Sequence, residues 1–188
     1  MKTLVILLVV LLLAGLMVGG KAVSIRNELV VQQEAIRAAW AQVDVVLERR
    51  ADLIPNLVET VKGMAAQERA VIDSVTQARA ALLGARTPQE RIEANTALDS
   101  ALGRLLLVVE NYPQIKSSES FLRLQDELAG TENRIAVERR KYNETVQRYN
   151  TNIALFPNNL VAALFGFERN NDYFTTEPGR RAAPRVAF

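Results

Sequence analysis

The sequence predicts an all-α protein in which an N-terminal transmembrane helix precedes an antiparallel, up-and-down four-helix bundle. Three observations predict this fold. An uncharged apolar run occupies Leu4–Gly20. Beyond it, apolar residues recur at alternating spacings of three and four, which is typical of amphipathic helices. The remaining sequence is rich in Ala, Glu, Arg, Val and Leu, as packed helices usually are.

The apolar run is long enough to cross a membrane. A helix of about 17–25 residues spans the hydrocarbon core of a bilayer, and the side chains of Lys2 and Lys21 can reach the headgroups on either side. We therefore expect a transmembrane anchor at residues 1–22. The alternative is a cleavable secretory signal that ends at Ala22, which the Lys inside the cleavage motif disfavours.

Basic residues near the run bear on its orientation. Lys21, Arg26 and Arg37 follow the run and only Lys2 precedes it, so the positive-inside rule favours a bundle on the cytoplasmic side. A single Lys before a signal-like run favours the opposite side. We expect the cytoplasmic orientation.

The first two helices of the bundle, which we assign to residues 23–168, are expected to meet at a reversal around Pro55. One apolar seam runs from Leu29 to Ile54 and a second from Leu57 to Leu82. A single helix carrying both seams would be about 80 Å long at 1.5 Å per residue, too long for the other helices to cover. Proline is tolerated in the first turn of a helix, so we expect Pro55 near the start of the second helix.

The expected reversal contains four polar residues, Arg49, Arg50, Asp52 and Asn56. Asp52 is placed to cap the second helix and to pair with a neighbouring Arg. We interpret the stretch as a structural turn, and the alternative is a docking tip for a partner protein.

The boundary between the second and third helices is the clearest in the chain. Gly84 is suited to the end of a helix. Thr87 and Glu90 have the Thr-x-x-Glu spacing of a capping box, and Pro88 occupies the first helical position after Thr87. We therefore expect the third helix to begin at Pro88.

The fourth helix is expected to be the longest. Pro113 ends the helix before it, and Ser117 or Ser118 can provide the N-cap. Residues 158–167 predict a short apolar helix that closes one end of the bundle, and residues 169–188 predict a flexible tail. Large apolar side chains recur every seven residues along the fourth helix, at Phe121, Leu128, Ile135, Tyr142, Tyr149 and Phe156.

The chain contains no His and no Cys. This excludes imidazole bases, thiolate nucleophiles, disulfides and the usual zinc sites. A net charge of +2 gives no basic signature of nucleic-acid binding. We therefore expect a non-enzymatic protein with no cofactor and no nucleic-acid partner. The alternatives are a metal-dependent or Ser-Lys hydrolase and a ligand-sensing bundle.

Several polar side chains fall at positions where the seams predict burial. Without histidine they cannot form the Glu-x-x-His pairs of di-iron bundles, so we expect ion pairs with arginine that fix the helix register. An all-oxygen site for Mg²⁺, Ca²⁺ or Mn²⁺ is the alternative. The polar residues are Glu68, Asp99, Glu132 or Glu138, and Asn133, and the candidate arginines are Arg49, Arg50, Arg104 and Arg139.

A Tyr-Asn pair occurs twice, at Tyr142–Asn143 and at Tyr149–Asn150. Seven residues make two helical turns, so the two tyrosines share one stripe and the two asparagines share the next. We expect buried rings whose hydroxyls reach a partner at the rim. The alternative is a surface that binds a peptide or a partner helix.

Three long segments resemble the LemA family of bacterial membrane-anchored proteins. They are AWAQVDVVLERRADLIPNLVETVKG, LGRLLLVVENYPQIKSSESFLRLQDELAGTENRIAVERRKYNETVQRYN and FPNNLVAALFGF. The resemblance extends over nearly all of the chain after the apolar run. It implies one membrane helix followed by an antiparallel helical bundle, and a location in the bacterial inner membrane.

The resemblance implies no particular reaction, because the family has no established biochemical activity. The family usually has a His immediately before the acid at Glu68, and Gln67 stands there in this chain, which argues against a metal ligand. We therefore expect a non-enzymatic scaffold or interaction protein in envelope or membrane organisation, with unidentified envelope proteins as partners.

Overall fold

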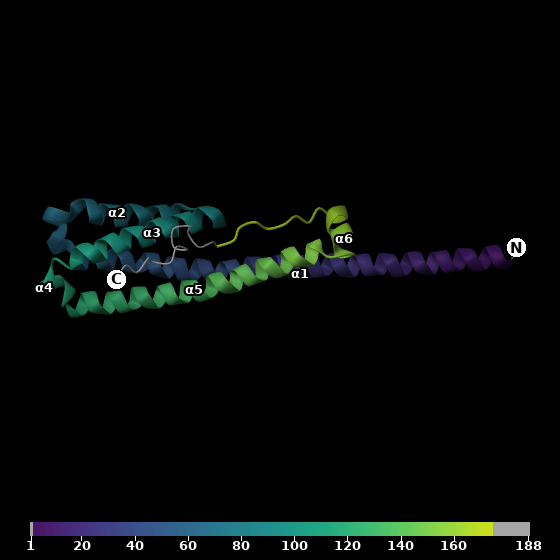
Figure 1. Ribbon diagram of the computed structural model, residues 1–188, viewed down its shortest axis with the longest axis horizontal. Coiled ribbons are helices and arrows are strands. Elements are labelled where there is room, and N and C mark those ends of the chain that lie inside the picture. The colour runs from purple at the N-terminus through teal and green to yellow at the C-terminus, as the bar shows by residue number, and fades with distance from the viewer. Residues whose placement is uncertain (1, 175–188) are drawn as a thin grey trace, which may run out of the picture. The chain divides into compact units, whose positions relative to one another are not determined.

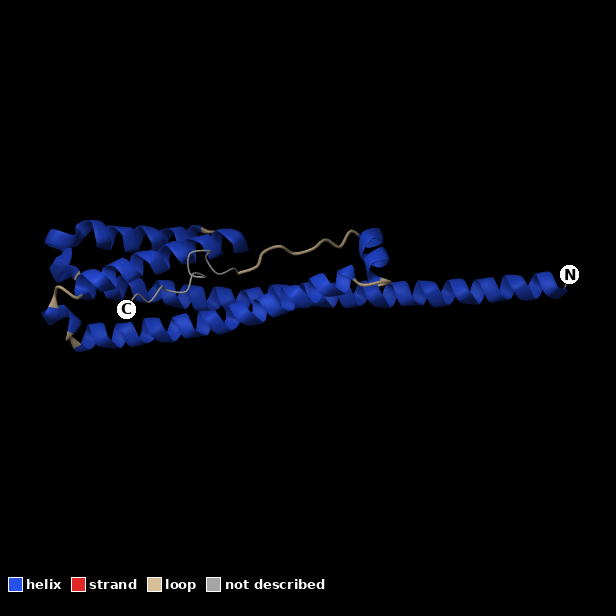
Figure 2. Ribbon diagram, in the orientation of Figure 1, coloured by secondary structure: helices blue, strands red, loops and turns tan. Residues whose placement is uncertain are grey.

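The computed structural model describes residues 2–174, apart from the side chains of residues 64–66. Every regular element in this range is a helix, which confirms the all-α prediction (Figure 2). The part of the predicted tail at 175–188 lies outside the described residues. The elements are α1 (Lys2–Thr60), the 3₁₀ helix η1 (Lys62–Met64), α2 (Ala65–Gly84), α3 (Pro88–Val109), α4 (Pro113–Lys116), α5 (Glu119–Ala154) and α6 (Asn158–Phe165).

These residues form two compact units. The first unit contains residues 2–39 and 142–171, which include the beginning of α1, the end of α5 and all of α6. The second unit contains residues 40–141 and 172–174. In the second unit α1, α2, α3 and α5 lie alongside one another (Figure 1), and they form the bundle that the sequence predicts. The domain boundaries expected at residues 22 and 168 stay predictions.

The predicted reversal at Arg49–Asn56 is wrong. Helix α1 continues through Pro55 to Thr60, and the chain reverses only at Val61 and η1. Asp52 and Asn56 therefore lie exposed on the surface of a helix and not in a turn. The lengths of the other helices rule out a single helix that carries both seams, but they are compatible with a reversal that begins beyond the proline.

A side chain from α2 makes the interior proline tolerable. Residue 55 of a regular helix would donate its N–H to the carbonyl of Ala51, and Pro55 has no N–H to donate. The Arg79 Nε donates to that carbonyl oxygen at 2.8 Å and so satisfies it. The apolar stripe also passes the proline unbroken, and its members are Leu47, Ala51, Ile54, Leu57 and Val61, all buried.

The free energy gained by burying apolar side chains favours a helix that continues through Pro55. An interior proline costs a helix about 3 kcal/mol, whereas each fully buried Leu or Ile contributes about 1.5–3 kcal/mol. Ending the helix at Pro55 would take Leu57 and Val61 out of this stripe, although both are fully buried in the structure. Tertiary packing therefore outweighs the local preference of proline.

The capping box between α2 and α3 is confirmed. The Thr87 Oγ1 accepts the Glu90 N–H at 3.2 Å, and the Glu90 carboxylate accepts the N–H groups of Arg86 at 2.8 Å and Thr87 at 3.3 Å. The Arg86 and Thr87 N–H groups lower the pKa of the Glu90 carboxyl group, because they stabilise its charged form. This tight connection lets α2 and α3 pack against each other as a hairpin.

Helix α5 begins and packs as predicted but ends differently. The Ser118 Oγ accepts the N–H of Phe121 at 3.3 Å, so Ser118 provides the N-cap. The seven-residue repeat from Phe121 to Tyr149 is buried. The last expected member of the repeat, Phe156, lies beyond the end of α5 and is 79% exposed, so that part of the prediction is wrong.

The short apolar helix expected after Pro157 is present as α6. It ends at Gly166, whose φ of 72° is the left-handed conformation that glycine adopts at helix ends. Val161 and Ala162 are its buried residues. Its large side chains Leu160, Leu164 and Phe165 are exposed. The expected closure of one end of the bundle by this helix stays a prediction.

The contact between Arg79 and Ala51 leads to a prediction that a double-mutant cycle can test. We expect Arg79→Met to destabilise the protein by about 1.5–3 kcal/mol, because it leaves a part-buried carbonyl without a donor. Pro55→Ala supplies a backbone N–H for the same carbonyl, so Arg79→Met should cost less than half as much in that background. Urea unfolding of the four variants measures the coupling. Equal costs in both backgrounds would contradict this account of the proline.

Candidate functional site

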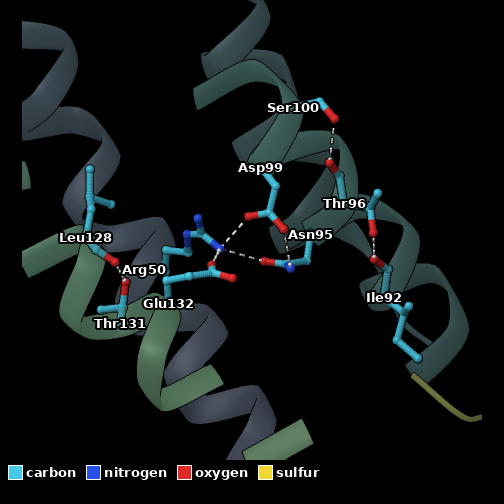
Figure 3. A network of polar contacts seen from close by, with 9 residues as sticks. All are labelled: Arg50, Ile92, Asn95, Thr96, Asp99, Ser100, Leu128, Thr131 and Glu132. Atoms are coloured by element: carbon cyan, nitrogen blue, oxygen red, sulfur yellow. Dashed lines mark hydrogen bonds and ion pairs between the residues drawn. The ribbon is translucent and has the colours of Figure 1, made fainter. Parts of the chain in front are cut away.

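An ion cluster around the buried Arg50 joins three helices of the second unit (Figure 3). Arg50 of α1 is 6% exposed. Its Nη1 lies 2.5 Å from Oδ1 of Asp99 on α3 and 2.6 Å from Oε2 of Glu132 on α5. Asn95 accepts from the same Nη1 at 3.4 Å and donates to the second Asp99 oxygen at 3.2 Å. One guanidinium group therefore holds α1, α3 and α5 at a fixed register.

The charges of the cluster are unequal, because two carboxylates share one buried cation. Burial raises the pKa of the Asp99 carboxyl group, and the nearby Arg50 opposes that rise. The charge of Glu132 adds to the rise, and that of Arg139 reduces it. The Asp99 carboxyl group therefore ionises less readily than an exposed aspartic acid.

The geometry of the cluster favours a structural role over metal binding. The guanidinium of Arg50 occupies the position between the two carboxylates that a divalent cation would need. Among the residues that the structure describes, no group of three or more Asp, Glu, His or Cys side chains could hold a metal ion. Buried ion pairs of this kind are known to specify helix register.

Arg91 and Arg49 form further ion pairs between α1 and its neighbours. Arg91 of α3 lies 2.7 Å from Asp44 of α1, and both side chains are partly buried. Arg49 of α1 lies 3.4 Å from Glu127 of α5, where both side chains are largely exposed. Exposed pairs contribute at most about 1 kcal/mol, so Arg91 matters more for the packing of α1 than Arg49.

The expected set of buried polar residues is only partly brought together. Glu132 and Asp99 meet Arg50, as the pairing hypothesis predicts. Asn133 is exposed and takes no part in the cluster. Glu138 pairs with Lys141 at 2.8 Å on its own helix.

Glu68 lies apart from the cluster, at a kink in α2. Its φ of −116° and ψ of 27° are not helical. The Tyr112 hydroxyl donates to the Gln67 amide oxygen at 2.9 Å and lies 3.5 Å from a Glu68 carboxylate oxygen. Partial burial and the Glu68 charge raise the pKa of Tyr112. Gln67 and Glu68 thus connect the start of α2 to the segment between α3 and α4.

The second Tyr-Asn pair fixes the chain that follows α6. The Tyr149 hydroxyl donates to the Glu168 carbonyl at 2.9 Å and accepts from the Gln33 amide at 3.1 Å. Asn150 donates to the Asn170 carbonyl at 2.6 Å and accepts the Asn170 N–H at 2.9 Å. Burial raises the pKa of Tyr149. The pair therefore has a structural role within the first unit.

The first Tyr-Asn pair contributes to packing in the same unit. The Tyr142 ring is fully buried, and Asn143 is half-buried. Both tyrosine rings are thus buried, in agreement with the shared stripe that the sequence predicts.

An aromatic contact in the second unit was not predicted from the sequence. Phe174 stacks on Trp40 with ring centroids 5.8 Å apart, and the guanidinium of Arg139 lies 4.6 Å from the centre of the Phe174 ring. Residues 169–174 belong to the predicted tail, yet Asn170 is hydrogen-bonded and Phe174 is buried. The aromatic pair Tyr173–Phe174 in an otherwise polar stretch was the available signal.

A shallow groove lies where α1 ends and α5 begins. It has a volume of about 450 Å³ and a mixed polar and apolar lining. The lining residues are Asn56, Glu59, Thr60, Ser120, Arg123, Leu124 and Glu127.

Comparison with known proteins gives one family and several relatives. The model of the LemA family matches residues 39–188. The chain is 28% identical to magnetosome protein MamQ 2 of Paramagnetospirillum magneticum, over 81% of this chain and 65% of that protein. It is 26% identical to magnetosome protein MamQ of Magnetospirillum gryphiswaldense over the same shares. It is 27% identical to protein LemA of Metamycoplasma hominis, over 73% of this chain and 63% of that protein.

The chain spans slightly less than two thirds of the length of these relatives. The match extends across both units and includes the cluster around Arg50.

The raised pKa of Asp99 predicts a pH-dependent contribution to stability. Because the folded chain binds this proton more tightly than the unfolded chain, the contribution is largest below the ordinary pKa of Asp, about 3.9. It is lost as the pH rises through the folded pKa. We therefore expect Asp99→Asn to gain stability relative to the parent as the pH rises from about 4 to about 7. Urea unfolding across this range measures the difference.

The matched control is Asp52→Asn, which neutralises an exposed carboxylate on α1. It shows what the same chemical change does outside the cluster. A constant difference between Asp99→Asn and the parent at every pH would contradict the pKa argument.

Proposed function

The chain belongs to the LemA family, and from this premise we propose that it is a single-pass membrane protein whose helical bundle serves as a non-enzymatic scaffold. The bundle would bind other proteins of the bacterial envelope. We place the anchor in the inner membrane, with the bundle on the cytoplasmic side. Three basic residues lie within about 20 positions after the apolar run, and one precedes it.

The observation that carries the proposal is the apolar start of α1. An 18-residue window of this helix has a mean hydropathy of 2.8, and none of it is buried within the structure. In water such a surface would drive aggregation, whereas a bilayer solvates it and the helix satisfies its own backbone. By length and composition α1 is a candidate membrane span, and it continues into the bundle as one helix.

The polar contacts inside the bundle support a scaffold. The charged groups of Arg50, Asp99 and Glu132 form ion pairs between helices. Arg91 of α3 likewise pairs with α1. Catalysis needs a group left available to a substrate, and a scaffold needs a rigid surface. Two of the relatives are named magnetosome proteins. The interaction role that we propose for this chain rests on the contacts within its bundle and not on those names.

The groove between the end of α1 and the start of α5 is our candidate for partner binding. Arg123, Glu59 and Glu127 line it together with the apolar Leu124. This mixed lining suits a peptide segment with both charged and apolar side chains. We propose this groove as the docking surface in place of Arg49–Asn56, whose alternative interpretation from the sequence was a docking tip.

Deletion of Leu4–Gly20 tests the anchor. The full chain should sediment with membranes and resist extraction by carbonate, whereas the deletion variant should be soluble and still unfold cooperatively. The reason is that the seams of α1, α2, α3 and α5 are buried against one another without help from the deleted residues. Fractionation and circular dichroism measure the two properties. A full chain that stays in the soluble fraction would refute the anchor.

Site-specific photo-crosslinking in cells tests the groove. A photo-reactive amino acid at Ser120, in the groove, should give adducts with envelope proteins. The same amino acid at Ser100, which is exposed on α3 outside the groove, is the matched control. We expect at least a threefold difference in adduct yield. Equal yields at the two positions would exclude the groove as the docking surface.

A further inference from the structure

A second apolar surface lies on α6 and the turn before it, in the first unit. From Ala154 to Phe167 the chain has no charged residue. Five large apolar side chains in this stretch are between 46% and 79% exposed, and we call them the α6 patch. They are Leu155, Phe156, Leu160, Leu164 and Phe165.

The α6 patch lies close to the end of the apolar run of α1. The Phe165 ring packs under the guanidinium of Arg26, 5.6 Å from its centre. Arg26 follows Lys21 by five residues, or about 8 Å along the helix. Figure 1 shows α6 running across α1 and not along it. If α1 crosses a bilayer, α6 is therefore oriented parallel to the membrane surface and near its level.

Hydrogen bonds hold α6 in this position. The Asn158 amide donates to the Asn152 side chain at 2.5 Å, and Asn152 donates to Glu28 of α1 at 3.1 Å. At the other end, Tyr149 and Asn150 bind the backbone of Glu168 and Asn170. Polar contacts thus fix both ends of α6 while its large side chains remain exposed.

We propose that the α6 patch inserts into the headgroup region of the same bilayer that α1 crosses, as a second membrane contact. The inference rests on the proposed anchor. Helices in the membrane interface bury an apolar face about 5–10 Å into the boundary of headgroups and acyl chains. Arg26, which contacts Phe165 of the patch, and Lys21, five residues before it on α1, attract anionic headgroups. The contact fixes the rotation of α1 about its own axis, which a single span leaves free.

Lipid is the expected partner of the α6 patch, because the patch adjoins the apolar run of α1. The exposed surface of residues 2–20 needs a bilayer that ends near Lys21, and that boundary lies within about 8 Å of the contact between Arg26 and Phe165. A soluble protein that bound the patch would have to displace the lipid headgroups next to it. Insertion of the patch into the bilayer requires no displacement of this kind.

Depth-dependent fluorescence quenching tests the proposal in the full chain. The chain has no Cys, so each introduced thiol is unique. Leu160→Cys and Leu164→Cys, labelled with bimane, would be reconstituted into vesicles of phosphatidylcholine and phosphatidylglycerol that contain lipids with a shallow or a deep nitroxide. Leu8→Cys, in the apolar run of α1, reports whether that run is inserted in the bilayer. Leu107→Cys, an equally exposed leucine on α3 of the second unit, is the matched control.

We expect shallow nitroxides to quench Leu160→Cys and Leu164→Cys at least twofold more than Leu107→Cys, and more than deep nitroxides do. Leu8→Cys should be quenched most by deep nitroxides. Quenching at Leu8→Cys with both α6 positions at the level of Leu107→Cys would overturn the α6 contact and keep the anchor. No quenching at Leu8→Cys would overturn both.

Iodide, a water-soluble quencher, shows whether a protein and not lipid covers the α6 patch. If the α6 positions are shielded from iodide but nitroxide lipids do not quench them, another protein or a second copy of this chain covers the patch. That result would also overturn the lipid contact.

Discussion

The packing of the bundle depends on the need to neutralise one buried cation. Arg50 lies on the inner side of α1, and its guanidinium is almost completely removed from water. A buried charge without partners costs several kcal/mol, so the folded state must place Asp99 and Glu132 beside it. This sets the rotation and the axial position of α3 and α5 against α1. The apolar seams alone would tolerate a shift by one heptad, since Leu, Ile and Val side chains are similar in shape.

Pro55 in α1 is a second constraint on the packing. Here too a charged side chain of another helix satisfies the requirement. A local defect in one helix, the unpaired Ala51 carbonyl, is repaired by a charged side chain from another, Arg79. Arg50 and Arg79 together tie α1 to α2, α3 and α5. The charged residues of the second unit therefore determine which helix faces lie together, and apolar burial supplies most of the stabilisation.

The sequence predicts the helices and their caps better than it predicts the position of the first reversal. Thr87, Glu90 and Ser118 act through backbone groups within three residues, so their capping roles are visible locally. Pro55 is tolerated through Arg79, which lies 24 positions further along the chain, and no local pattern reveals that contact. The unbroken stripe from Leu47 to Val61 was a usable signal. Of the expected polar site, Asp99 and Glu132 meet Arg50, which was one of four candidate arginines. Asn133 follows Glu132 by one residue on the same helix and is exposed. The contacts of Phe174 with Trp40 and Arg139 join parts of the chain that no periodicity relates.

The most direct test of the role of Arg50 compares the free energy of unfolding of two variants with that of the parent. Arg50→Met leaves two carboxylates near each other without their cation. Because the Glu132 side chain is 46% exposed, the cost should lie above about 1 kcal/mol and not exceed about 3–5 kcal/mol. The combined replacement Arg50→Met, Asp99→Leu and Glu132→Leu removes all three charges and should recover most of that loss. Such a recovery is what a register device made of mutually dependent charges predicts. A loss below about 1 kcal/mol for Arg50→Met, or no recovery in the triple variant, would contradict the account.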